Sequence, residues 1–170
     1  TFIRTSIETA ELAKLVLNAF LATKISFANM IADLCERIPN TDVGDVMRIV
    51  GLDPRIAPQF FGAGLGFGGS CLPKDLKALI KFGSKMNVSM DLLESVVKIN
   101  ERRINWVIDV LKRNNIDHSK NILVLGLSFK PKTNDVRGSV GIKIVKRLLA
   151  EGYSVSVYDP VACLLYTSPS

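Results

Sequence analysis

Apolar residues recur at three- and four-residue spacings over two long stretches of the chain, and this period predicts two long helices. The first runs from residue 8 to about residue 37, where Pro39 and Asn40 end it. The second runs from Met90 to Arg113, and Ser89 can provide its N-terminal cap. The apolar positions of the first helix are Leu12, Leu15, Val16, Ala19, Phe20, Phe27, Ile31 and Leu34.

Two shorter helices are predicted between the long ones. Asp42 can cap a helix over 43–50, and a proline in the first turn favours a helix over 73–82. Glycines, Gly51 and Gly83, mark their C-terminal ends. The segment between these helices holds five of the chain's twelve glycines within eight residues, which predicts a loop with special backbone needs.

After the polar stretch 114–121 the pattern changes to short apolar runs. The sequence predicts a strand at Ile122–Leu125, a helix from Ser139 to Ala150, and a strand at Ser154–Tyr158. This order is typical of a parallel β-α-β unit. A single unit cannot cover both faces of a parallel sheet, so we expect it to begin a larger α/β domain that is cut off here.

These patterns divide the chain into three parts. Residues 1–115 form a mostly helical domain, and residues 116–160 form the first β-α-β unit of an α/β domain. The last ten residues, VACLLYTSPS, continue neither pattern, and we interpret 161–170 as a non-native tail.

Composition and charge exclude several classes of protein. With 48% hydrophobic and 22% charged residues, the chain is expected to fold around a core. Charges or amides interrupt every apolar run before about 18 residues, so we expect no membrane partner. The net charge of +6 favours anionic partners such as phosphates, but the basic residues form no dense block and predict no nucleic-acid binding.

The cysteines are too far apart to suggest a disulfide framework or a metal site. Cys35, Cys71 and Cys163 form no CxxC pair, which is typical of a reduced, cytoplasmic protein. His118 is the only histidine, so no zinc site is expected. We expect Cys35 to lie in the core, His118 to be solvated and Trp106 to serve packing.

The strongest local signal is GAGLGFGGSCLPKD, in which Cys71 follows the glycine-rich loop and precedes a helix. The positive end of a helix dipole and the nearby Lys74 and Lys77 favour the thiolate, the reactive form of cysteine. The alternative is a tight turn with a small buried cysteine.

Two further groups of residues indicate anion binding. Lys14 and Asn18 are four residues apart on one helix face, where they could stabilise an oxyanion; a solvated lysine beside Glu11 is the alternative. Lys130 and Arg137 lie in a basic loop after a strand, where open α/β sheets bind ligands; a plain exposed loop is the alternative. The basic loop itself carries neither a GxGxxG nor a GxxxxGK[ST] motif.

Three segments together resemble the UDP-glucose/GDP-mannose dehydrogenase family. They are AELAKLVLNAFLATKISFANMIADLCE, DPRIAPQFFGAGLGFGGSCLPKD and GLSFKPKTNDVR, in the family's order and over about residues 5–160. The DPRI and GLGFGGSC segments resemble the UDP-glucose branch. GGSCLPKD is shared with the GDP-mannose branch, which stays open as an alternative.

The resemblance implies a three-domain enzyme. Its parts are an N-terminal NAD-binding Rossmann domain, a helical middle domain that forms a homodimer or higher homo-oligomer, and a C-terminal Rossmann-like domain that binds the nucleotide sugar. This chain corresponds to the middle domain and the start of the C-terminal one. We therefore expect the chain alone to be inactive, and a purely helical dimerisation module is a further alternative.

The implied reaction oxidises UDP-glucose to UDP-glucuronate in two hydride transfers to NAD. Cys71 matches the nucleophile that holds the aldehyde as a thiohemiacetal and then as a thioester. Lys14 matches an acid/base or oxyanion stabiliser, Asn18 shares its water, and Asp75 supports both. Lys74 and Arg137 match positions near NAD, together with Cys71.

The resemblance also implies a set of residues that contact the substrate. These are Lys14, Asn18, Arg55 from the neighbouring subunit, Gly62, Ala63, Gly64, Leu65, Gly66, Phe67, Gly68, Phe129 and Lys130. No metal is implied. The chain departs from the family pattern at Gly62, where many relatives have lysine, and at Gly138, where many have glutamate.

Overall fold

The computed structural model describes residues 2–162 and divides the chain into two compact units. The helical unit comprises Thr1–Gly64 and Cys71–Ile99, and the mixed unit comprises Leu65–Ser70 and Asn100–Ser170. About half of the chain is helical, and the sheet is small and parallel. The predicted domain boundary at residue 115 stays a prediction. Most of the predicted tail 161–170, including Cys163, lies outside the described residues.

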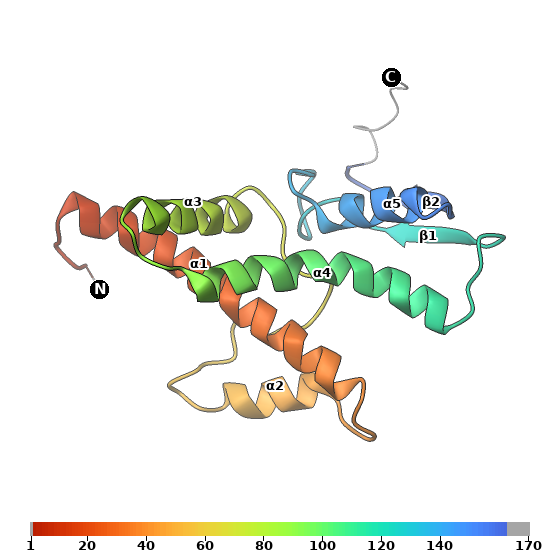
Figure 1. Cartoon of the computed structure of the whole chain (residues 1–170), viewed down its shortest axis with the longest axis horizontal. Helices are drawn as coiled ribbons and strands as arrows, with labels where there is room; N and C mark the ends of the chain where they lie inside the picture. The colour runs from red at the N-terminus through yellow and green to blue at the C-terminus, as the bar shows by residue number, and fades with distance from the viewer. Residues whose placement is uncertain (1, 163–170) are drawn as a thin grey trace. The chain divides into compact units, whose positions relative to one another are not determined.

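The helical unit is built on the long helix α1, Ile7–Cys35, which contacts α2, Val43–Gly51, and α3, Leu72–Lys85 (Figure 1). Its N-terminus is capped by Ser6, whose hydroxyl oxygen accepts a hydrogen bond from the Thr9 amide at 3.2 Å. The predicted cap of α2 is confirmed, because the Asp42 carboxylate accepts a hydrogen bond from the Asp45 amide at 3.0 Å.

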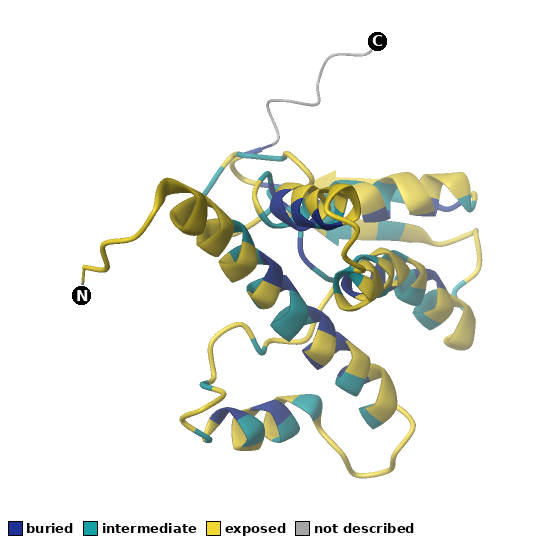
Figure 2. Cartoon of the chain, turned by 60° about the vertical axis from the view of Figure 1, so that its left-hand side comes forward, coloured by how far each residue is buried: buried dark blue, intermediate teal, exposed yellow. Residues whose placement is uncertain are grey.

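Helix α1 buries small side chains and exposes large ones. The buried residues are Ala19, Ala22, Ser26, Ala28, Asn29 and Ala32. Eight large apolar residues along the helix are exposed: Ile7, Leu12, Val16, Leu17, Phe20, Phe27, Met30 and Leu34. Figure 2 shows dark blue and yellow stretches alternating along this helix. The periodicity therefore correctly predicted a helix, but only some of its apolar residues form the core of this chain.

Several predicted details of the helices need correction. Helix α3 continues through Gly83 to Lys85, because Gly83 is buried and leaves the space that the Met90 side chain occupies. A Cβ at Gly83 would lie 2.6 Å from the Met90 Cγ, so this glycine serves packing and not helix termination. Cys35 is half-buried and not part of the core. Helix α4, Asp91–Arg113, begins one residue later than predicted and contributes to both units.

The mixed unit contains the predicted β-α-β arrangement. Strand β1, Asn121–Leu125, pairs in parallel with β2, Ser154–Tyr158, in a register that joins Asn121 to Ser154 and Leu125 to Tyr158. Helix α5, Val140–Ala150, connects them and is capped as predicted by Ser139, whose hydroxyl accepts from the Ile142 amide. One cluster of buried residues in the core of this unit comprises Ile108, Ile144, Leu148 and Tyr153.

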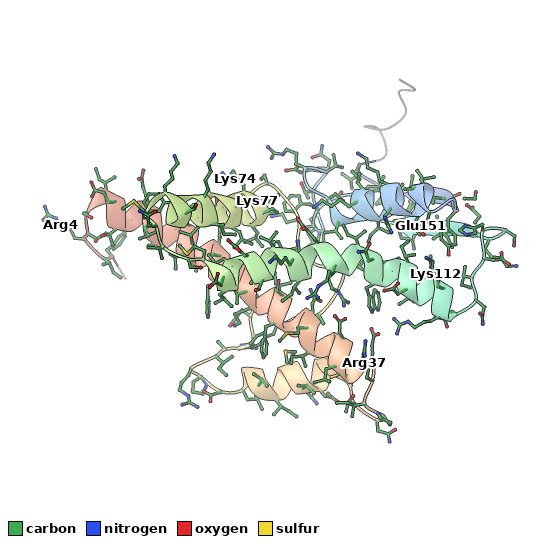
Figure 3. All side chains as sticks on the ribbon, in the orientation of Figure 1. Arg4, Arg37, Lys74, Lys77, Lys112 and Glu151 are labelled. Atoms are coloured by element: carbon green, nitrogen blue, oxygen red, sulfur yellow. The ribbon has the colours of Figure 1, made fainter. Side chains whose placement is uncertain are left out.

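In the mixed unit, an ion pair joins the C-terminal ends of α4 and α5. The ammonium of Lys112 on α4 lies 3.4 Å from the carboxylate of Glu151, which follows α5 (Figure 3).

One face of the sheet is open: Leu123 and Leu125 of β1 are 58% and 71% exposed. The exposure of these strand residues agrees with the expectation that one β-α-β unit leaves part of its sheet uncovered.

The expectation that no segment is apolar and long enough to cross a membrane is wrong for α1. By length and composition alone, this helix could do so, because an 18-residue window has a mean hydropathy of 1.5 with few charges. Core helices of soluble proteins meet the same criterion, and 39% of this window is buried inside the protein.

Candidate functional site

A buried carboxylate in the helical unit brings together three of the predicted site residues. Asp75 on α3 is 2% exposed and accepts hydrogen bonds from Lys14 and Asn18, which lie one turn apart on α1. The distance from Asn18 Nδ2 to Asp75 Oδ2 is 2.6 Å, and the same oxygen pairs with the Lys14 ammonium. The alternative was a solvated lysine beside Glu11; the Lys14 side chain is 56% exposed, and its ion pair is with Asp75.

The cluster is electrostatically asymmetric. The hydrogen bond from Lys14 is the main reason that the pKa of Asp75 lies below its ordinary value, and Asn18 and the charge of Lys74 act in the same direction, while burial opposes them. The Lys14 side chain is 56% exposed although its partner is buried. An ammonium has three donors, so Lys14 can hold Asp75 and still offer donors toward solvent or a ligand.

Cys71 stands at the N-terminus of α3, where it is the N-cap residue and is exposed. Leu72 and Pro73 form the first turn, and the carbonyl of Cys71 accepts the Asp75 amide at 2.9 Å. The thiol-bearing residue and the buried carboxylate are thus joined by one helical turn. Lys74 and Lys77 lie close together on the same helix, and the Lys74 ammonium is 3.6 Å from Asp75 (Figure 3).

The loop between α2 and the glycine-rich segment 62–69, here called the glycine run, holds Arg55 in a fixed geometry. Its guanidinium pairs with the Asp53 carboxylate through Nε at 3.0 Å and Nη2 at 2.7 Å, which raises the pKa of Arg55 and lowers that of Asp53. The Lys24 ammonium binds the carbonyls of Ile56 and Ala57 at 3.0 and 2.8 Å. Arg55 therefore projects from a loop that is itself tied to α1.

The glycine run is split between the two units. In the helical unit, Gly62, Ala63 and Gly64 are exposed, and the Gly64 amide donates to the buried Asn29 side chain at 2.7 Å. Space beside Gly62 and Gly64 is open to beyond 4 Å. These glycines leave room next to the backbone, as the sequence predicted for a loop that a ligand approaches.

In the mixed unit, residues 65–70 are held by hydrogen bonds to the Asn100 side chain and by a close backbone approach to Gly138. The Asn100 side chain accepts from the Phe67 amide at 2.8 Å and donates to the Phe67 carbonyl at 3.0 Å. Gly138 has φ 62°, and a Cβ there would lie 2.8 Å from the Gly69 carbonyl oxygen. A side chain at residue 138 would therefore collide with the backbone of Gly69.

A groove of about 670 Å³ lies in the mixed unit along β1 and the loop that follows it. Phe129 and Lys130, two of the predicted substrate contacts, line it together with Leu65 of the glycine run and Trp106 of α4. The Phe129 ring also packs on Gly69, where a Cβ would come within 2.6 Å of the ring. Trp106, for which only packing was expected, is half-buried and covered by the guanidinium of the buried Arg103 at 4.7 Å.

Arg137 lies in the same loop, and its geometry is fixed by a carboxylate. The Asp135 carboxylate accepts from its Nε and Nη2 at 3.0 and 2.7 Å. This pairing lowers the pKa of Asp135 to about 2. With its side chain 73% exposed, Arg137 presents a fixed cation to solvent.

Some residues that shape the site were not predicted from the sequence. Asn29 and Asn100 hold the glycine run, and Asp135 and Asp159 hold the loop after β1. A polar residue inside an otherwise apolar helix stripe is a signal that could have identified Asn29. No group of three or more metal-ligating side chains occurs among residues 2–162.

Two family models match the chain and between them cover most of it. Residues 8–102 match the central domain of the UDP-glucose/GDP-mannose dehydrogenase family, and residues 123–165 match the UDP binding domain of the same family. Both matches agree with the resemblance drawn from the sequence motifs.

Known proteins of similar sequence and structure carry related names. UDP-glucose 6-dehydrogenase TuaD of Bacillus subtilis is 46% identical over 161 residues, which are 94% of this chain and 35% of that protein. A UDP-glucose dehydrogenase from Pyrobaculum islandicum superposes with a TM-score of 0.87 at 43% identity, covering 92% of this chain and 36% of that one. A GDP-mannose dehydrogenase from Pseudomonas aeruginosa gives a TM-score of 0.59 at 30% identity, covering 99% and 38%. The chain spans about a third of the length of the curated relatives it matches.

Proposed function

Because the chain belongs to the UDP-glucose/GDP-mannose dehydrogenase family, we propose that it is part of an NAD-dependent enzyme that oxidises UDP-glucose to UDP-glucuronate. The observation that carries the proposal is the arrangement within the helical unit. An exposed cysteine begins the helix whose first turns also carry the buried carboxylate that binds Lys14 and Asn18. The identity to UDP-glucose 6-dehydrogenases supports the choice of sugar.

In the proposed reaction, the primary alcohol of the sugar first loses a hydride and a proton and becomes an aldehyde. The Cys71 thiolate adds to the aldehyde carbon, and the resulting thiohemiacetal loses a second hydride to become a thioester. Water then cleaves the C–S bond, releasing the carboxylate and the thiol. NAD would accept the hydride in each oxidation. The covalent bond to Cys71 keeps the aldehyde in the site between the two oxidations.

Lys14 and Asn18 would stabilise the oxygen that carries negative charge at the tetrahedral stages. Their geometry suits this role, because both side chains donate hydrogen bonds to the buried Asp75 carboxylate, while the Lys14 side chain stays more than half exposed. The hydrogen bond from Lys14 lowers the pKa of Asp75, so the Asp75 carboxylate is ionised when it pairs with Lys14.

The residues near the cofactor suit an anionic group. Lys74 in the helical unit is 72% exposed, and Arg137 in the mixed unit is 73% exposed and fixed by Asp135, so each side chain is open to an anionic group. Within the mixed unit, the substrate would lie against Leu65 and the Phe129–Lys130 segment, which line the groove. The mixed unit would accordingly begin a Rossmann-like domain, and the open face of its sheet supports this proposal.

The exposed apolar residues of α1 support assembly of the helical unit as a homodimer, with Arg55 reaching the neighbouring site. We place the reaction in the cytoplasm, because Cys71 must remain a reduced thiol to act as proposed.

The test uses the intact dehydrogenase that contains this chain. Incubation with UDP-glucose and NAD should form two NADH for each UDP-glucuronate, whereas GDP-mannose should be a poor substrate. Cys71→Ala should abolish formation of the carboxylate, and Cys35→Ala is the matched control that should retain it. Carboxylate formed by Cys71→Ala at the parent rate would refute the covalent mechanism. Preferential oxidation of GDP-mannose, whose dehydrogenase this chain resembles at 30% identity, would reassign the substrate.

A further inference from the structure

A buried acidic residue in the mixed unit, Asp159, lies at the carboxyl end of β2 and lines the groove. Its side chain is 4% exposed and accepts five hydrogen bonds. One carboxylate oxygen accepts from the amides of Leu127 and Ser128 at 2.7 and 3.0 Å and from the Ser128 hydroxyl at 3.1 Å. The other accepts from the amides of Val161 and Ala162 at 2.8 and 2.7 Å.

The end of the second strand is the position at which a dinucleotide-binding β-α-β unit carries the acid that binds a ribose. Asp159 cannot act in this way here, because a carboxylate has about four lone-pair sites and five donors already occupy them. The four backbone amides also keep its pKa well below the ordinary value, so it does not exchange protons near neutral pH. Neither ligand binding nor acid–base catalysis suits this side chain.

The donors that Asp159 binds lie immediately before the proposed substrate contacts. Leu127 and Ser128 precede Phe129, whose amide donates to the Asp135 carbonyl at 2.9 Å and whose ring packs on Gly69. Lys130 follows, with its ammonium 5.4 Å from the Phe129 ring centre. The carboxylate therefore fixes the backbone from which Phe129 and Lys130 reach the groove and the glycine run.

We infer that Asp159 is a positioning residue for nucleotide-sugar binding, which acts by anchoring the backbone of the Phe129–Lys130 segment to the end of β2. The inference rests on the proposed function, since it concerns the segment assigned there to the substrate. In this inference, Asp159 contributes to substrate binding without contacting the substrate itself.

The main test variant is Asp159→Asn in the intact dehydrogenase. An amide keeps only one acceptor oxygen, and its NH2 group would face N–H donors, so one pair of amides loses its acceptor. The KM for UDP-glucose and the Kd for UDP should rise about tenfold, the size expected for one or two charged hydrogen bonds, while kcat stays within about twofold. Ser128→Ala removes one donor only and should raise both constants by about two- to threefold.

Asp117→Asn is the matched control. Asp117 is also a carboxylate that accepts from the amide and hydroxyl of a serine two residues later, Ser119, but it lies apart from the groove-lining residues. This variant should leave KM and Kd unchanged. A purely structural role for Asp159 would lower the fraction of folded enzyme, and therefore the apparent kcat, without changing KM or Kd.

The outcomes separate the inference from the proposed function. Unchanged KM and Kd in both Asp159→Asn and Ser128→Ala would overturn the inference even if the parent oxidises UDP-glucose. If Asp159→Asn does not fold, Ser128→Ala decides by the same criterion. A parent enzyme that neither binds UDP nor oxidises a nucleotide sugar would refute the proposed function. Hydrogen exchange over residues 127–133 still tests the anchor in that case, and unchanged exchange in Asp159→Asn would refute it.

Discussion

Gly68 and Gly138 come so close that a Cβ atom on Gly68 would overlap the carbonyl oxygen of Gly138. The two residues lie 70 positions apart in the sequence and belong to the same unit. This contact holds the loop that leads to Cys71 against the loop that carries Arg137. Backbone packs directly on backbone here, so neither loop can move aside easily when a side chain is added.

Gly68→Ala should destabilise the chain by about 1–3 kcal/mol, because the added methyl group meets backbone atoms and not a flexible side chain. Gly62→Ala is the control, since no atom lies within 4 Å of the position its Cβ would take. Urea unfolding followed by circular dichroism measures both. Equal stability of the two variants would show that the contact between residues 68 and 138 does not form.

Asp75 should make the stability of the chain depend on pH. Its pKa is lowered in the folded state, so its contribution is complete above the unfolded value of about 3.9 and is lost as pH falls through the folded value. Asp75→Asn should lower the free energy of unfolding by about 1–3 kcal/mol at pH 7, and the difference from the parent should shrink below about pH 4. Asp45→Asn, which breaks an exposed pair with Arg48, should cost less than about 1 kcal/mol. A difference that is constant from pH 7 to pH 2 would contradict the ionised pair.

Lys14→Ala should slow the intact dehydrogenase without removing the thiol. Loss of a donor to the oxyanion typically lowers kcat by about 100-fold or more, and alkylation of Cys71 should still occur at a similar rate. Lys81→Ala, which removes an exposed lysine on α3 to which no role in the reaction is assigned, is the comparison. If both variants lose activity equally, Lys14 has no special place in the chemistry.

Cys71 should react with iodoacetamide several-fold faster than Cys35 at about pH 7, since it is exposed at the start of α3 whereas Cys35 is half-buried. The sequence also predicts that Cys71 reacts faster than Cys163, which lies outside the described residues. Peptide mass spectrometry after timed labelling gives the three rates. Faster labelling of Cys35 than of Cys71 would contradict the proposed nucleophile.

The chain should dimerise through the exposed apolar residues of α1. Phe20 is 62% exposed near the middle of this helix, so Phe20→Asp should convert a dimer at high micromolar concentration into a monomer. Leu92→Asp is the control, because Leu92 is equally exposed at 66% but lies on α4. Sedimentation velocity distinguishes the species, and a parent chain that is monomeric would refute the prediction.

The sequence by itself determined the order and type of every helix and strand in the described part of the chain. Local physics is sufficient for this: helix periodicity, the caps Asp42 and Ser139, and the short β-branched runs each act within a few residues. The sequence also singled out Cys71, Lys14 and Asn18, because a glycine run before a thiol and a helical spacing of four are local signals.

Only the tertiary structure decided which side of α1 is buried and which distant groups meet. An apolar period predicts a helix equally well whether its large side chains face the core or a partner, and here the small residues face the core. Helix termination at Gly83 was predicted wrongly because the space that Met90 needs is not a local property. The joining of Lys14 and Asn18 to Asp75, and the anchoring of the Leu127–Ser128 amides by Asp159, depend on contacts between residues more than 30 positions apart. Such contacts form when the helices and strands pack, and no short stretch of sequence encodes them.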